Sequence, residues 1–115
     1  MIAHVVLFRP KSTLLQEDRQ ALVSALQQAI DGIPSITRAS IGKRVLLNRP
    51  GYETLMSEHY EYVAILEFAS ETDLREYLDH PAHAELGMRL FKSADTVLAY
   101  DFNCTGPAGL SALLK

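Results

Sequence analysis

The four histidines of this sequence are the side chains best suited to move protons near neutral pH. They are His4, His59, His80 and His83, and the last two flank a proline in the stretch "YLDHPAH" that begins at Tyr77. A neutral imidazole can accept a proton, and a protonated one can donate it. These residue types therefore suggest general acid–base chemistry.

Each of these residues also has an interpretation in which it does no chemistry. His4 lies among apolar neighbours in "IAHVVLFR", where a core histidine satisfied by one hydrogen bond is the commoner case. His59 is most simply a solvated residue at the start of a strand. Tyr77 lies on the apolar side of an expected helix, so packing is its default role and its hydroxyl then needs a partner.

Metal and cofactor chemistry find little support in the sequence. Two histidines three residues apart can share a metal, but His4 or Glu85 would have to complete the ligand set. Neither an HExxH pattern nor a cysteine partner accompanies the pair, so we expect no metal. We also expect no cofactor, because the chain contains no phosphate loop and no dinucleotide fingerprint. Cys104 has no evident catalytic partner, and no G-x-S-x-G motif marks a nucleophilic serine.

Composition limits the classes of protein to which the chain can belong. Its 115 residues suit one domain, which we place at residues 1–103, followed by a C-terminal tail at 104–115. The formal net charge of −3 argues against nucleic acid as a partner, because phosphate binding needs a basic surface. No apolar run is long enough to span a membrane, and the N-terminus does not resemble a signal peptide. With a single cysteine, the chain is expected to be cytoplasmic.

Hydrophobic periodicity and turn residues predict the elements that would position the histidines. Thr13 with Gln16, and Ser70 with Asp73, have the form of capping boxes at helix starts. A loop is expected at 48–57, where Asn, Pro and Gly cluster. The predicted strands are residues 2–9, 36–47, 58–69 and 95–102, and the predicted helices are residues 14–31 and a second helix that follows Ser70.

The proline of "YLDHPAH" is expected to divide the second helix. The residue before a proline avoids helical geometry, whereas a proline in the first turn loses no hydrogen bond. We therefore expect one segment to end near Asp79 and another to begin at Pro81. His83 would then lie in a first helical turn, where the helix dipole tends to lower a histidine pKa and to keep the ring neutral.

The element order βαββαβ predicts an α+β, ferredoxin-like antiparallel sheet with two helices on one face. The strands carry apolar or aromatic residues on both faces, so the face without helices needs a partner. A second copy of the chain is the simplest one. We therefore predict a homodimer in which two sheets face each other as a dimeric α+β barrel.

Several stretches of the chain resemble the stress-responsive A/B barrel (Dabb) family of the dimeric α+β barrel superfamily. They are "HVVLF", "GIPSI" and "EFASETDLREYLDHPAH", together with an aspartate near the end, here Asp101. The resemblance covers about residues 1–103 and implies the same fold and dimer. Most members have no assigned reaction, but a plant branch contains cofactor-independent polyketide cyclases. In that branch a first-strand histidine, a tyrosine and the second HPAH histidine form the site, which corresponds here to His4, Tyr77 and His83.

The resemblance and the residues together lead to three hypotheses. The first is a cofactor-independent lyase, cyclase or isomerase that acts on a small aromatic or polyketide-like substrate through His4, Tyr77 and His83. The second is a non-catalytic stress-responsive dimer or a protein that binds a small apolar or aromatic ligand. The third is a monooxygenase of the same barrel superfamily, with no tryptophan or clear haem-ligand context to support a haem version. The apolar walls expected around a substrate are Val6, Phe68, Leu86 and Phe91.

Overall fold

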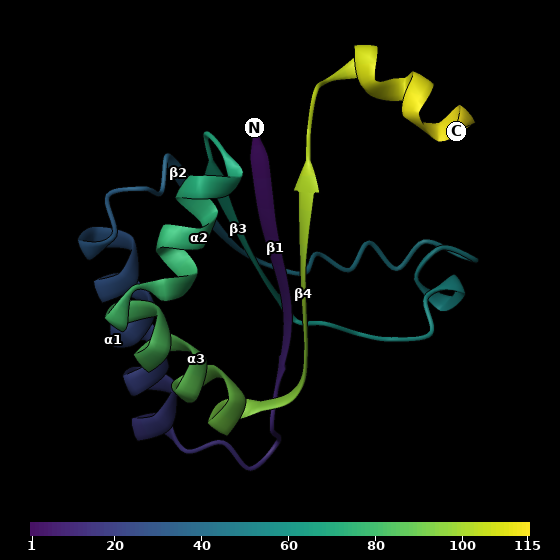
Figure 1. The fold of residues 1–115 in the computed structure, drawn as a ribbon. Coiled ribbons are helices and arrows are strands. Elements are labelled where there is room, and N and C mark those ends of the chain that lie inside the picture. The colour runs from purple at the N-terminus through teal and green to yellow at the C-terminus, as the bar shows by residue number, and fades with distance from the viewer.

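The computed structural model describes residues 1–115 and contains a four-stranded antiparallel sheet with helices on one face (Figure 1). The strand order is β2-β3-β1-β4, so β1 is central and β4 is an edge strand. This is the ferredoxin-like α+β arrangement that the element order predicted, and the predicted fold class is confirmed. The strands are β1 (Ile2–Pro10), β2 (Arg38–Lys43), β3 (Tyr62–Phe68) and β4 (Ala94–Asn103).

All three α-helices lie on the same side of the sheet (Figure 1). They are α1 (Gln16–Gly32), α2 (Glu71–Asp79) and α3 (Pro81–Ser93). The chain also contains two 3₁₀ helices, η1 (Glu53–Leu55) and η2 (Pro107–Leu114). None of these helices combines the length and the apolar character that a membrane crossing would require.

The core lies between this helical layer and the sheet. Alternate strand residues point toward the helices, and Phe68 of β3 is completely buried there. Burying each large apolar side chain of this kind contributes about 1.5–3 kcal/mol to folding. The main core cluster contains Ile2, Ala25, Ala29, Ile33, Leu66, Phe68, Leu74, Tyr77 and Leu86.

The break in the second helix lies where the proline rule predicted it. His80 has extended geometry, with φ −73° and ψ 140°, between the end of α2 and the start of α3. Its imidazole Nδ1 accepts a hydrogen bond of 3.0 Å from the backbone N–H of Ala82, so His80 caps α3. The break turns the chain so that Tyr77, in the last turn of α2, and His83, in the first turn of α3, lie close to each other.

Two of the local sequence predictions differ from the structure. The Thr13 capping box does not form, because α1 begins at Gln16 with Leu15 as N-cap and without a side-chain capping bond. The second and third strands are shorter than predicted, since the pairing between them ends at Lys43 and Tyr62. Residues 44–61 instead form an arm that leaves the sheet on the side away from the helices (Figure 1).

The two predicted caps give a matched test of local stability. Ser70 Oγ accepts a hydrogen bond of 3.2 Å from the backbone N–H of Asp73, whereas Thr13 caps no helix. Ser70→Ala should therefore lower the free energy of unfolding by about 1 kcal/mol. Thr13→Ala should change it by less than about 0.5 kcal/mol, as a surface substitution does. Urea unfolding of both variants measures the difference, and equal effects would contradict the capping assignment.

Candidate active site

The site begins with a buried histidine paired to a carboxylate on the neighbouring strand. His4 of β1 lies directly opposite Asp101 of β4, and its Nδ1 is 2.6 Å from Asp101 Oδ1. The His4 side chain is 8% exposed and that of Asp101 is 44% exposed. An ionised carboxylate only accepts hydrogen bonds, so His4 Nδ1 is the donor and Nε2 is the ring nitrogen left for another partner.

Tyr77 joins this pair to the second histidine. Its ring centroid lies 5.6 Å from that of His4 and 4.7 Å from that of His83, both in edge-on arrangements. The other neighbour of the Tyr77 ring is Phe68, at 5.3 Å. The structure therefore brings together the three residues His4, Tyr77 and His83, which come from β1, α2 and α3.

The environment of Tyr77 keeps its hydroxyl protonated. Burial raises the pKa of Tyr77 to about 12, and the negative charge of Asp101 adds to the effect. A phenol with this pKa stays neutral throughout the physiological range. Tyr77 is therefore suited to donate a hydrogen bond to an oxygen that gains negative charge, and unsuited to act as a base.

The environment of His83 favours a ring that accepts a proton, whereas that of Tyr77 favours a donor. Burial lowers the pKa of His83 below its ordinary value, and positive charge on His4 lowers it further. The backbone carbonyl of Leu78 raises the pKa, but as the smaller effect. The sequence predicted this direction from the helix dipole, whereas the structure attributes it to burial and to the second histidine. His83 is thus a neutral imidazole that can accept a proton near neutral pH.

Open space lies beside His83 along α3. Gly87 is one helical turn after His83 and therefore lies on the same side of the helix. A Cβ atom built at Gly87 would meet no atom within 4 Å, so the protein does not fill this volume.

The four predicted apolar walls occupy different environments. Phe68 is fully buried and Leu86 is 8% exposed, and both belong to the core cluster. Val6 is half-buried on β1, two residues after His4 and on the same side of the strand. Phe91 is 74% exposed on α3, so in this chain it does not shield the site from water.

The remaining histidines, His59 and His80, make local structural contacts. His80 caps α3, and His59 Nδ1 lies 2.6 Å from an Arg44 Nη1 in the arm. No three His, Cys, Asp or Glu side chains gather into a group that could hold a metal ion. The sequence did not identify Asp101 as the partner of His4, since its only signal was the family resemblance.

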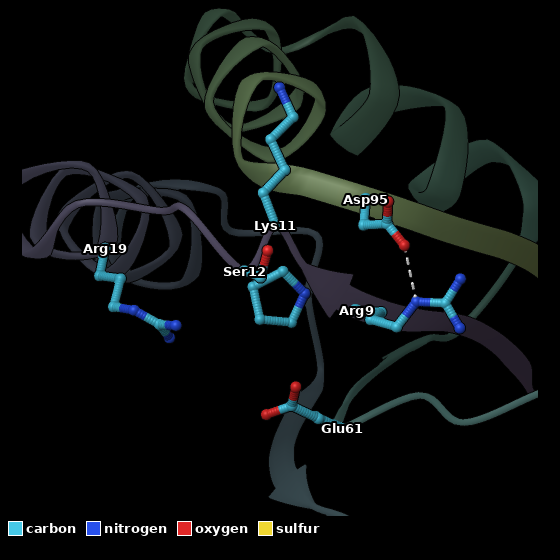
Figure 2. A pocket seen from close by; sticks show the side chains of 7 residues that line it. Arg9, Lys11, Ser12, Arg19, Glu61 and Asp95 are labelled. Carbon is cyan, nitrogen blue, oxygen red and sulfur yellow. Dashed lines mark hydrogen bonds and ion pairs between the residues drawn. The ribbon is translucent and has the colours of Figure 1, made fainter.

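A separate cavity lies near the opposite end of β1, and its chemistry is different. Figure 2 shows its charged lining, in which Arg9 Nε is 2.9 Å from Asp95 Oδ2. The cavity has a volume of about 320 Å³ and no apolar lining residue. Arg9 also bonds Glu58 and Thr96, so its guanidinium is already engaged by the protein. The cavity is therefore a weaker candidate than the His4–Tyr77–His83 site.

The chain matches one protein family over almost its whole length. Residues 2–104 match the family described as Stress responsive A/B Barrel Domain. The chain belongs to this family. No protein with a curated functional description matches the chain.

Solved structures show the same fold in proteins of known and unknown activity. A hydroxynitrile lyase from Passiflora edulis aligns with a TM-score of 0.75 and 17% identity, over 92% of this chain and 96% of that chain. A dimeric ferredoxin-like protein of unknown function from Thermobifida fusca aligns with a TM-score of 0.70 and 21% identity, over 90% of each chain. A Dabb protein from Mesorhizobium loti has a TM-score of 0.70 and 19% identity, over 91% of this chain and 97% of that chain. At these identities, the likeness establishes the fold.

The coupling between the two site histidines can be measured directly. In an NMR titration, His83 should show a pKa below the ordinary value of 6.5. His4→Ala should raise the pKa of His83, because it removes a neighbouring positive charge, while burial still keeps the value below 6.5. His59→Ala, in the arm, is the control and should leave it unchanged. An unaltered pKa of His83 in His4→Ala would contradict the coupling.

Proposed function

We propose that the protein is a cofactor-independent lyase, cyclase or isomerase that moves a proton on a small aromatic or polyketide-like substrate. The observation that carries the proposal is the convergence of His4, Tyr77 and His83, with Asp101 behind His4. Two imidazoles in different environments and a neutral phenol provide an acceptor and donors in one place. A packed core alone would not need this combination of side chains.

Each residue has a role that follows from its surroundings. His83 is the base, because burial keeps its imidazole neutral. When the substrate C–H bond breaks, its electron pair moves into an enolate and the proton bonds to His83. Tyr77 donates a hydrogen bond to the enolate oxygen. His4 is held by Asp101 through Nδ1, which leaves Nε2 to accept a hydrogen bond from a substrate hydroxyl. The proton that His83 has gained returns from His83 to the substrate when the enolate collapses.

The substrate class follows from the surroundings of the site. Val6, Phe68 and Leu86 supply apolar surface around the site. No lysine or arginine forms a hydrogen bond or ion pair with His4, Tyr77, His83 or Asp101. Such surroundings favour a substrate with an uncharged aromatic or alkyl portion over a phosphorylated one. A hydroxynitrile lyase with the same fold supports the choice of reaction class, because the fold accommodates a lyase.

A non-catalytic ligand-binding role is the second candidate. Tyr77 is only 2% exposed and packs against Phe68, as a purely structural tyrosine would. In this alternative, the trio would bind a small apolar or aromatic ligand without changing it. Measuring proton transfer separates the two candidates.

The proposed proton transfer predicts enzyme-catalysed deuterium exchange. In D₂O, the wild-type protein should accelerate the replacement of the α-protons of a simple aryl ketone, such as acetophenone, as followed by NMR. His83→Ala should reduce the rate at least about 100-fold, because it removes the base, and His4→Ala should also reduce it strongly. His59→Ala should exchange at the wild-type rate, and circular dichroism should confirm that all variants fold. Exchange at the buffer rate with the wild-type protein would leave ligand binding as the function.

The open space beside His83 predicts where a substrate can be blocked. Gly87→Leu should fill this space and abolish exchange, because the new side chain occupies the approach to the imidazole. Met88→Leu is the matched control, since Met88 is 52% exposed on the same helix and its replacement should leave exchange unchanged. Thermal denaturation should show both variants folded. Full activity in Gly87→Leu would contradict this route of access.

We also infer that the protein is a homodimer assembled through the sheet face that carries no helices. The strand pairing places three cross-strand rows of mostly apolar side chains on this face. Tyr100 and Phe102 are 57% and 52% exposed in the single chain, although both are large aromatic residues. A contiguous apolar face of this kind marks an interaction surface, and similar structures include proteins described as dimeric. Its apolar members are Val5, Leu7, Val63, Ile65, Leu98, Tyr100 and Phe102.

A further inference from the structure

We propose that the arm, residues 44–61, is a second contact surface for the partner copy and extends the interface beyond the sheet. The proposal rests on the homodimer inferred above, and it adds a segment that the sequence had assigned partly to strands and partly to a loop. Three observations support it: the side chains of the arm, the anchoring of its base, and a pocket where it leaves the sheet.

The arm exposes more apolar surface than a free loop should. A loop surrounded by water is normally polar, and contiguous exposed apolar surface usually marks a contact site. In this arm Val45 is 74% exposed and Leu55 is 75% exposed, and no part of the single chain covers them. The large apolar residues that the arm exposes are Val45, Leu46, Leu47, Tyr52, Leu55 and Met56.

The direction of the arm is fixed at its base by one arginine. Arg9 of β1 donates to Glu58 Oε2 at 3.0 Å and to the His59 carbonyl at 3.3 Å. The same guanidinium donates to Asp95 Oδ2 at 2.9 Å and to Thr96 Oγ1 at 2.7 Å, which ties the returning end of the arm to β4. Arg9 therefore holds the arm on the side of the sheet opposite the helices (Figure 1).

A pocket of about 440 Å³ lies where the arm meets the sheet. Leu7 and Val63 contribute to it from the face without helices, and Met56 and Tyr60 contribute from the arm. The pocket thus continues the proposed dimer face without a gap. Five of its eight lining residues are apolar, which suits an apolar side chain of the partner, and two-fold symmetry would use both arms and both pockets at once.

A second copy fits these observations better than a different protein. The arm and the face without helices are continuous through Leu7 and Val63, so one occupant covers both. A self-complementary interface needs apolar surface on the same side of each copy, and this chain presents its arm and its open sheet face on that side (Figure 1).

Two methionines provide a matched test of the arm. Met56 lies in the arm and is 55% exposed, and Met88 lies on α3 and is 52% exposed. Met56→Asp should raise the dimer dissociation constant at least about 10-fold, because it places a hydrated carboxylate where an apolar side chain would be buried. Met88→Asp should leave the dissociation constant unchanged. Sedimentation equilibrium measures both, and circular dichroism should confirm that both variants fold.

A third variant separates the arm from the dimer itself. Tyr100→Arg changes the sheet face that carries no helices. Tyr100 is 57% exposed in the single chain, so the substitution leaves the core of each subunit intact. A dimer weakened by Tyr100→Arg but unchanged by Met56→Asp would overturn the role of the arm and leave the homodimer standing. A wild-type protein that sediments as a monomer at micromolar concentration would overturn both.

Discussion

A four-stranded sheet with apolar residues on both faces must be covered twice, and the three helices of this chain cover only one face. This constraint arises in the strands, where successive side chains alternate between the two sides. The helix side supplies the core and the cluster around Tyr77. The other side supplies the surface that we assign to a second copy. The two proposed activities of the molecule, chemistry and assembly, therefore occupy opposite faces of one sheet.

On the helix side, the site depends on two features that act together. The pairing of β1 with β4 places a carboxylate directly opposite His4, and their hydrogen bond fixes one ring nitrogen. The helix break before Pro81 places Tyr77 and His83 at adjoining helix ends, so that two rings six positions apart in the sequence are in contact. Burial then separates their proton affinities, because it keeps the phenol protonated and the imidazole neutral.

Local sequence signals predicted much of this arrangement, and the parts they missed have physical reasons. The cap at Ser70 and the break before Pro81 depend on neighbouring residues, and both are present. Thr13 has an equally good capping pattern, but α1 begins too far along the chain for its hydroxyl to reach a free N–H. The apolar run after Lys43 has the composition of a strand, yet no strand pairs with it. Local composition cannot distinguish an apolar segment that pairs within a sheet from one that does not. The partner of His4 lies 97 positions away, and only the strand register reveals it.

The alternation along β1 also has a consequence for how such a protein can change over time. Even-numbered residues such as His4 face the helices, while odd-numbered residues such as Val5 face the open side. Substitutions on one side can therefore accumulate without disturbing the other, and reactivity and self-association can diverge separately within a lineage. An inserted or deleted residue in β1 has no such freedom. It would exchange the two sides at once, turning the imidazole outward and an aliphatic side chain inward.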